Sequence, residues 1–319
     1  MRKILVTVPV FELPECAPAR ELLKEAGIEY VYCPVGEDNQ ELFDANIESV
    51  EAAIVASEPW DDAKLRRAKN LKIVSRFGTG YDAVDCDAAR RLNIDVTNTR
   101  VREIIDGVAE LAIGFIVCAL RDIPRLCAEA KNRNWMASKG TILEGKTVGL
   151  LGFGGIARSV AKRLSGFDVN ILAYDMYPDE ATAKALNVTL TDMDTVLRES
   201  DIVSLHIPSN AQTRHFMNAA QFAKMKPSSI FINTARGALV DEAALYEALR
   251  DGVIYRAATD VFEEEPTNPN NPLFTLDNFI CTPHVAGNCG EAMATNALAA
   301  VQNVIDCFEG RELKTLVNP

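Results

Sequence analysis

The stretch Thr147-Val148-Gly149-Leu150-Leu151-Gly152-Phe153-Gly154-Gly155-Ile156-Ala157 decides the fold of this chain. Its first five residues form a short apolar run that is typical of a buried parallel strand, and residues 157–164 have the pattern of a helix. The glycines therefore stand in a strand-to-helix turn with GxGxxA spacing. Gly152 permits the tight turn, and Gly154 allows backbone N–H groups to approach a pyrophosphate at the positive end of the helix. The segment predicts a dinucleotide-binding turn.

Asp175 indicates which dinucleotide is bound. It follows the next apolar run, residues 169–174, where a carboxylate accepts hydrogen bonds from the adenosine ribose diol and repels a 2′-phosphate. A glycine-rich turn alone is often only a helix start, but here the strand, the helix and the acid stand in register. We therefore expect NAD as the cofactor, with contacts from Gly152, Phe153, Gly154, Gly155, Ile156 and Asp175.

Short apolar runs alternate with helical patterns along the whole chain, which is the signature of doubly wound α/β domains. Predicted strands of a first unit lie at 4–8, 29–32, 53–56, 73–76 and 94–97. After a helical pattern at 108–120, a second set lies near 147–151, 169–174, 201–205, 229–232, 255–260 and 279–281. The last helical pattern, 290–308, comes after these strands, so we expect it to pack on the first unit. The prediction is two parallel-sheet domains: a Rossmann NAD-binding domain, 99–285, inserted in a flavodoxin-like substrate-binding domain, 1–98 plus 286–319.

Length and composition are typical of a cytoplasmic enzyme. The chain has 319 residues, 48% of them hydrophobic, which is enough for two cores. No stretch approaches the ~20 apolar residues of a membrane span, and Met1-Arg2-Lys3 leads directly into a predicted strand without a secretion signal. The eight cysteines form no CxxC pair, which favours reduced thiols. The net charge of −12 argues against nucleic acid or an anionic membrane as a partner.

Three polar residues follow three successive predicted strands: Arg236, Glu265 and His284. Taken singly, each is most simply a surface arginine, an acidic loop residue and an isolated histidine. Because the carboxyl ends of parallel strands meet at one edge of the sheet, the three together predict a site. The histidines at 206, 215 and 284 have no metal-ligand spacing, so no metal is expected.

Ordered motifs give the chain a family resemblance. The glycine turn with Asp175 is followed by Ser204–Pro208 with Thr213–His215, by Asn233–Glu242, and by Asp260–Pro266 with Pro283-His284. Over essentially its whole length the chain resembles the D-2-hydroxyacid dehydrogenases. The resemblance implies a catalytic trio of Arg236, Glu265 and His284, and a homodimer formed through residues 108–135. It also implies cofactor contacts from His206, Pro208, Thr213, Thr234, Ala235, Asp260, His284 and Gly287.

The chemistry implied is hydride transfer between nicotinamide and a 2-hydroxy or 2-oxo acid. His284 would exchange the substrate proton, and Glu265 would orient the imidazole. Arg236 would clamp the substrate carboxylate with its planar, always charged fork. The amides of Gly78, Thr79 and Gly80 are expected to form a nest for the same carboxylate.

The loop Arg76-Phe77-Gly78-Thr79-Gly80 is most similar to the 3-phosphoglycerate dehydrogenase branch, in a short form without a regulatory domain. Arg76 would then bind a substrate phosphate, and the expected reaction is 3-phosphoglycerate/phosphohydroxypyruvate interconversion in serine biosynthesis. The sequence of residues 99–106 departs from the one usual in this branch of the family, so hydroxypyruvate or glyoxylate reduction remains an alternative reaction. The same fold and cofactor site would also suit an NAD-sensing corepressor or a formate-type or phosphite-type dehydrogenase.

Overall fold

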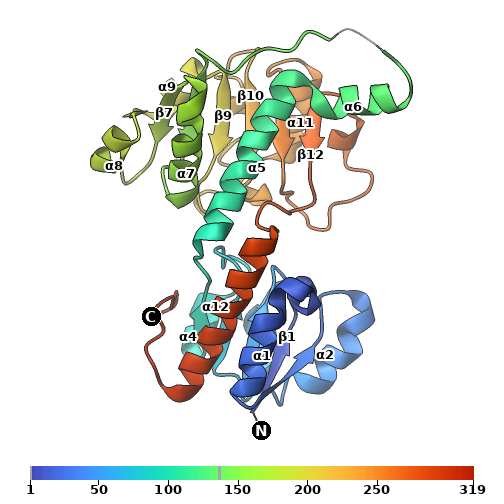
Figure 1. The fold of residues 1–319 in the computed structure, drawn as a ribbon, viewed down its shortest axis with the longest axis vertical. Helices are drawn as coiled ribbons and strands as arrows, with labels where there is room; N and C mark the ends of the chain where they lie inside the picture. Colours follow the sequence, from blue (N-terminus) through green and yellow to red (C-terminus); the bar gives the residue numbers. More distant parts are fainter. Residues whose placement is uncertain (1, 136–137) are drawn as a thin grey trace. The chain divides into compact units, whose positions relative to one another are not determined.

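The computed structural model describes residues 2–135 and 138–319, and the chain divides into two compact units (Figure 1). Unit 1 is Met1–Ile104 with Gly287–Pro319, and unit 2 is Ile105–Ala286. Both boundaries differ from the expected 98/99 and 285/286. The first lies later because the Asn98 N–H donates to the Thr315 carbonyl (3.2 Å) and the Thr99 N–H to the Gly78 carbonyl (3.0 Å), which keeps both residues in unit 1.

Unit 1 contains a parallel sheet with the order β2-β1-β3-β4-β5, which is the flavodoxin-like order. The central strand β1 pairs with β2 on one side and β3 on the other, so that Ile4 stands opposite both Tyr30 and Ala52. The strands are β1 (Arg2–Val6), β2 (Ile28–Tyr32), β3 (Ala52–Val55), β4 (Ile73–Arg76) and β5 (Asp95–Thr97).

Helices cover both faces of this sheet because alternate strand residues point to opposite sides. Ile4 and Val6 pack with α1 (Ala17–Glu25) and α12 (Gly290–Glu309). Leu5 packs on the opposite side, which is covered by α2 (Gln40–Asn46), α3 (Asp62–Arg67) and α4 (Cys86–Arg91). Figure 1 shows α12 beside α1, although the two come from opposite ends of the chain. The prediction that the last helix packs on the first unit is confirmed.

Unit 2 contains a seven-stranded parallel sheet with the order β12-β11-β10-β9-β6-β7-β8. After β8 the chain crosses back to the other side of β6, so the switch point of this sheet lies between β6 and β9. The strands are β6 (Thr147–Leu151), β7 (Asn170–Tyr174), β8 (Val188–Leu190), β9 (Ile202–Leu205), β10 (Ile230–Asn233), β11 (Arg256–Thr259) and β12 (Phe279–Cys281). The predicted fold class of two doubly wound parallel sheets is confirmed.

The core of unit 2 also has two sides. One side of the sheet packs against α5 (Arg102–Arg121) and α7 (Gly155–Leu164), and the other against α9 (Met193–Glu199), α10 (Ala219–Phe222) and α11 (Glu242–Arg250). The remaining helices are α6 (Ile123–Lys131) and α8 (Glu180–Ala185). Short 3₁₀ turns occur at Pro9–Glu12, Pro14–Cys16, Glu37–Asn39, Ser165–Phe167, Gly237–Leu239 and Pro272–Thr275.

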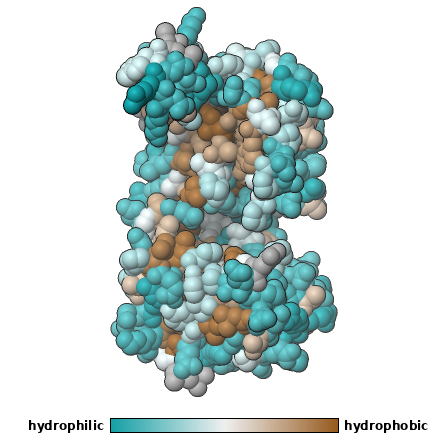
Figure 2. Space-filling model, turned by 90° about the vertical axis from the view of Figure 1, so that its right-hand side faces the viewer, coloured by the Kyte–Doolittle hydropathy of each residue, from teal (hydrophilic) through white to brown (hydrophobic). Residues whose placement is uncertain are grey.

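Many of these helices have an aspartate at the N-cap, and its side chain stabilises the first turn of the helix. Each accepts a hydrogen bond from the N–H three residues further on, which satisfies a donor that the helix itself leaves free. The capping residues are Asp61, Asp85, Asp179, Asp192 and Asp241. Within residues 2–135 and 138–319 no helix combines the length and the apolar character needed to cross a membrane. On the face shown in Figure 2, hydrophilic residues cover most of the surface and hydrophobic residues gather in limited patches.

Gly149 in the middle of β6 tests how tightly unit 2 is packed. A Cβ at this position would lie 2.6 Å from Cγ1 of Val196 and would also collide with the Ser200 hydroxyl, and both neighbours are fully buried. We expect Gly149→Ala to lower the free energy of unfolding by about 1–3 kcal/mol through overpacking. Gly166→Ala is the matched control, because a Cβ there meets nothing within 4 Å. Equal denaturant midpoints for the two variants would contradict the packing argument.

Candidate active site

The glycine turn between β6 and α7 has the geometry that a bound pyrophosphate needs. Gly152 has a φ of 96°, and a Cβ there would lie 2.6 Å from the His206 carbonyl oxygen, so only glycine fits. Gly154 is the N-cap of α7, and among the described residues nothing lies within 4 Å of the position of its Cβ. Gly155 and Ile156 begin α7, where N–H groups have no acceptor inside the helix. The turn therefore offers oriented donors beside open space, which fits the phosphates of NAD.

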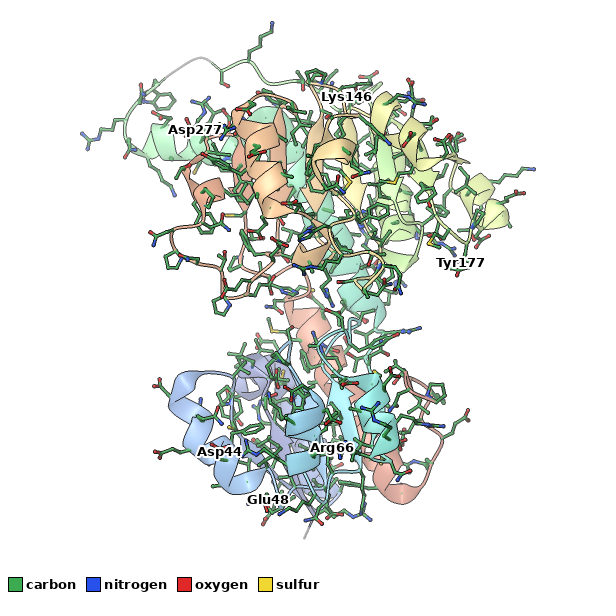
Figure 3. The ribbon with its side chains drawn as sticks, turned by 180° about the vertical axis from the view of Figure 1, so that it is seen from behind. Asp44, Glu48, Arg66, Lys146, Tyr177 and Asp277 are labelled. Atoms are coloured by element: carbon green, nitrogen blue, oxygen red, sulfur yellow. The ribbon has the colours of Figure 1, made fainter. Side chains whose placement is uncertain are left out.

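Asp175 lies directly beyond β7, against the same turn. Its Oδ2 accepts a hydrogen bond from the Phe153 N–H (2.7 Å), and its Oδ1 accepts one from the Tyr177 N–H (2.8 Å). Each carboxylate oxygen can accept more than one hydrogen bond, so both can still receive a ribose hydroxyl. The Tyr177 side chain itself points outward and is 84% exposed (Figure 3).

His206 follows β9 and is a neutral residue at physiological pH. Its Nε2 lies 2.9 Å from the Ser204 hydroxyl. Burial lowers the pKa of His206 to about 4, because a charged imidazole would lose its hydration there. A lowered pKa of this size favours the uncharged imidazole at neutral pH. Of the other expected cofactor contacts, Thr213 donates its hydroxyl hydrogen to the Pro208 carbonyl (2.9 Å) and closes the loop between them.

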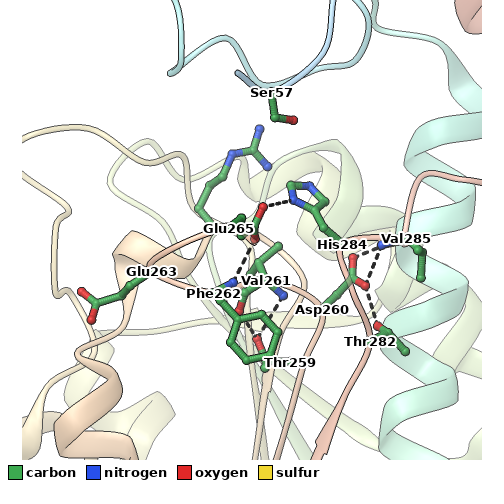
Figure 4. A network of polar contacts seen from close by, with 12 residues as sticks. Ser57, Thr259, Asp260, Val261, Phe262, Glu263, Glu265, Thr282, His284 and Val285 are labelled. Atoms are coloured by element: carbon green, nitrogen blue, oxygen red, sulfur yellow. Dashed lines mark hydrogen bonds and ion pairs between the residues drawn. The ribbon is translucent and has the colours of Figure 1, made fainter. Parts of the chain in front are cut away.

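A glutamate and a histidine form a hydrogen-bonded pair beyond β11 and β12 (Figure 4). The Nδ1 atom of His284 lies 2.6 Å from Oε2 of Glu265, and Oε1 of Glu265 accepts a hydrogen bond from the Phe262 N–H (2.9 Å). The His284 and Glu265 side chains are 34% and 31% exposed, so solvent or a ligand can reach them. This arrangement leaves Nε2 as the ring nitrogen that can exchange a proton with a ligand.

The groups around Glu265 change the pKa of its carboxyl group. Burial by itself would raise the pKa, but the hydrogen bond and charge of His284 oppose it. The Phe262 N–H and the positive charge of Arg236 act in the same direction, and the net result is a lowered pKa. Glu265 therefore remains ionised to a lower pH than an ordinary glutamate.

Arg236 follows β10 in a turn shaped by Asn233. The Asn233 amide donates to the Arg236 carbonyl (3.0 Å), and its side-chain oxygen accepts from the Ala235 N–H (3.0 Å). The next residue, Gly237, touches the loop beyond β11, since a Cβ there would overlap the backbone carbonyl of Phe262. This contact brings the ends of β10 and β11 together. Sequence reasoning missed both positioning residues, although an Asn before the turn and a Gly after the arginine are local signals.

Thr234 and Ala235 complete this turn, and both were expected to contact the cofactor. The Thr234 side-chain oxygen is buried and has no hydrogen-bond partner among the described residues. The Ala235 carbonyl accepts a hydrogen bond from Nη1 of Arg236 (2.7 Å).

Asp260, expected to lie near the nicotinamide, holds the loop after β12. Its fully buried carboxylate accepts hydrogen bonds from the Thr282 hydroxyl (2.5 Å) and from the N–H groups of Val285 and Ala286 (both 2.8 Å). Its own carbonyl accepts the His284 N–H (2.7 Å). His284 has a φ of 52°, an uncommon conformation for a residue other than glycine. Asp260 therefore holds the backbone that carries His284, as Figure 4 shows.

The expected substrate residues Arg76, Gly78, Thr79 and Gly80 belong to unit 1. The Arg76 guanidinium is largely buried, and it donates to the Ser57 hydroxyl (3.0 Å) and to the Phe77 carbonyl. The predicted nest of three amides needs a correction, because the Gly78 N–H donates to the Thr99 hydroxyl oxygen (2.7 Å). In the part of the chain that the structure describes, the N–H groups of Thr79 and Gly80 have no acceptor.

The structure thus brings Arg236, Glu265 and His284 together in unit 2, and it places the Arg76–Gly80 loop in unit 1. Gly287, an expected cofactor contact, also belongs to unit 1. Across the described ranges, no group of three His, Cys, Asp or Glu residues is arranged to hold a metal ion. His215 pairs with Glu263 in an exposed loop.

The chain is similar in sequence to a known family and to named relatives. Residues 113–286 match the family model described as "D-isomer specific 2-hydroxyacid dehydrogenase, NAD binding domain". The D-3-phosphoglycerate dehydrogenase of Archaeoglobus fulgidus is 37% identical over 99% of this chain, which covers 59% of that longer relative. The hydroxypyruvate reductase of Thermotoga maritima is 40% identical over 81% of this chain and 85% of its own length.

A solved structure shows the same likeness in three dimensions. The D-lactate dehydrogenase of Aquifex aeolicus, complexed with NAD and lactic acid, has 26% sequence identity and a TM-score of 0.88 over 100% of this chain and 99% of its own. The family match covers more than half of the chain, and the relatives extend the likeness to both units. This chain therefore belongs to the D-isomer specific 2-hydroxyacid dehydrogenase family.

Proposed function

We propose that this chain is an NAD-dependent dehydrogenase that interconverts a D-2-hydroxy acid and the corresponding 2-oxo acid. The observation that carries the proposal is the hydrogen-bonded pair of Glu265 and His284 beside the charge of Arg236, within the unit that contains the dinucleotide turn. When bound, NAD supplies the hydride acceptor for the oxidation.

The protein side of the reaction follows from these contacts. In oxidation, His284 Nε2 takes the proton of the substrate hydroxyl, and in reduction it returns a proton to the carbonyl oxygen. Glu265 holds Nδ1 and so fixes the orientation of the ring. Arg236 binds the substrate carboxylate through its planar fork.

The substrate that we favour is 3-phosphoglycerate, with phosphohydroxypyruvate as its product, which would place the reaction in serine biosynthesis in the cytoplasm. The name and the 37% identity of the Archaeoglobus relative support this substrate, and so does the buried arginine in the Arg76–Gly80 loop. Hydroxypyruvate or glyoxylate reduction is the second candidate. It is favoured by the name of the Thermotoga relative and by the bonds of Arg76 to Ser57 and Phe77, which already engage that guanidinium inside unit 1.

A substrate panel separates these candidates. Oxidation of NADH is followed with phosphohydroxypyruvate, hydroxypyruvate, glyoxylate, pyruvate and 2-oxoglutarate. We expect turnover with at least one of these 2-oxo acids and the highest kcat/KM with phosphohydroxypyruvate. A preference for hydroxypyruvate or glyoxylate would select the second candidate. Only trace turnover with every compound would contradict the enzyme proposal and favour an NAD-sensing binding protein.

His284→Ala tests the proton-transfer role. Loss of a positioned acid or base is expected to lower kcat by roughly 10²–10⁴-fold, while NADH binding is retained. The matched control is His215→Ala, which removes an imidazole from an exposed loop in the same unit and should leave kcat close to the wild-type value. Near-normal turnover of the His284 variant would exclude His284 as the acid or base.

The lowered pKa of Glu265 gives a pH dependence. Its ionised form is favoured in the folded protein, so the pairing with His284 is present above this pKa and is lost as the pH falls through it. In the reducing direction, protonation of His284 does not itself stop the reaction, so we expect kcat/KM to fall only below the usual glutamate range. Glu265→Gln should lower kcat/KM by about 10²-fold and abolish this acidic limb. An unchanged acidic limb in the variant would exclude Glu265 as its source.

We also propose a homodimer through residues 108–135. No residue of α6 is buried, and Ile123 and Trp135 are 43% and 91% exposed, whereas Phe115 and Ile116 of α5 are already buried in unit 2. The contact would therefore use α6 and the segment after it. Sedimentation equilibrium should give a dimer, and Ile123→Glu should shift the protein toward monomer. A wild-type monomer at all concentrations would contradict the proposal.

A further inference from the structure

Unit 1 contains a cleft of about 290 Å³, and none of the residues assigned to the proposed reaction lines it. Its walls are Thr7 after β1, the segment 33–36 after β2, and Glu58 after β3. Phe43 of α2 and Lys64 of α3 also line it. Every lining residue belongs to unit 1, so the cleft is defined by that unit alone.

The cleft occupies the position where doubly wound sheets bind ligands. In the order β2-β1-β3-β4-β5 the chain passes from β2 across β1 to β3, which makes the β1/β3 boundary the topological switch point. The helix after β1 packs on one face of the sheet, and those after β2 and β3 pack on the other. A crevice opens beyond the carboxyl ends of the strands at such a point, and here Thr7 and Glu58, whose side chains are hydrogen-bonded to each other, both line it.

Glu58 lines the cleft, and one of its carboxylate oxygens accepts no hydrogen bond from the described residues. Its Oε1 accepts hydrogen bonds from the Thr7 hydroxyl and from the Trp60 indole N–H (3.0 Å), which fix the side chain. Its Oε2 is buried and has no hydrogen-bond partner among the residues that the structure describes. A buried carboxylate oxygen without a donor costs free energy, and a ligand that supplies a charged N–H group would remove that cost.

A cation, Lys64, also lines the cleft. Lys64 donates one hydrogen bond to the Pro59 carbonyl, and an ammonium has three donors, so two remain for a ligand. Its Nζ lies 5.5 Å from the centre of the Phe43 ring, which holds the chain of the lysine over an apolar surface. The cleft thus offers an anionic acceptor, a cationic donor and an aromatic face within a volume suited to a small molecule.

We propose that unit 1 binds a small α-amino acid in this cleft, with its ammonium on Oε2 of Glu58 and its carboxylate on Lys64. An amino acid carries no 2-hydroxyl or 2-oxo group, so this ligand would not be a substrate of the reaction proposed above. The two proposals can fail independently, because turnover does not require the cleft and binding to the cleft does not require turnover.

Calorimetric titration of the full chain with L-alanine, glycine and L-serine tests the site. Propionate and ethylamine are the matched probes, since each lacks one of the two charged groups of L-alanine. We expect one-to-one binding of at least one amino acid, weaker binding of ethylamine, and no binding of propionate. No saturable binding of any amino acid, or binding of propionate as tight as that of L-alanine, would overturn the proposal.

Variants locate the binding. Glu58→Gln should weaken amino-acid binding about tenfold or more, because it removes the charge that faces the ammonium. Lys64→Gln should abolish the advantage of L-alanine over ethylamine. Glu48→Gln is the control, a change of the same kind at a residue that pairs with Lys69 on the surface of unit 1 (Figure 3), and it should leave the affinity unchanged.

Two further measurements keep the test decisive. Arg236→Gln should retain amino-acid binding, and its loss there would mean that the probe binds at the candidate active site. If Glu58→Gln does not fold by circular dichroism, amide chemical shifts of the wild-type protein replace it. Shifts of Val35 and Gly36 on addition of the amino acid support the site, and their absence under saturating binding refutes it.

Discussion

The buried carboxylate of Asp260 is the interaction on which the candidate active site depends. It lies just beyond β11 and gathers the chain that follows β12 through the Thr282 hydroxyl and two backbone N–H groups. These bonds stabilise the left-handed backbone conformation of His284, which is unfavourable for a residue other than glycine. Glu265 lies in the loop after β11, and His284 lies in the loop after β12. Their contact therefore requires that Asp260 holds the loop after β12 in place. The position of the proposed catalytic histidine thus depends on Asp260, whose carboxylate accepts hydrogen bonds from other residues of the same protein.

The parallel sheet supplies the second constraint. All seven strands of unit 2 run in one direction, so the residues after β10, β11 and β12 emerge at one edge. Gly237 brings the loops after β10 and β11 into contact. Because it has no side chain, the loop with Arg236 can touch the backbone of Phe262. Unit 1 obeys the same rule at its own switch point, where Thr7 and Glu58 meet.

The fold and the dinucleotide turn could be predicted from the sequence because short local patterns of residues indicate both. Gly152 and Asp175 lie in one short segment, and the structure gives them the turn geometry and the contact with each other's loop that the motif requires. The edge strand β8 was missed because its three residues, Val188–Leu190, are too few to show a period. The use of the Gly78 amide by Thr99 could not be predicted either, since the two residues meet only when β4 and β5 pair. For the same reason, no local pattern reveals that the buried carboxylate of Asp260 is satisfied by residues beyond β12.

The position of α12 affects the order in which the protein can be completed during synthesis. Unit 2 is continuous in sequence, and its core uses no residue beyond Ala286. The core of unit 1 is different, because Ile4 and Val6 pack against Ala297, Val301 and Val304 of α12. The ribosome makes the first five strands of unit 1 long before it makes the helix that covers one side of them. Until α12 emerges, the part of that apolar side that α1 does not cover stays open to water and to chaperones, so the part of the chain that is made first is the last to be finished.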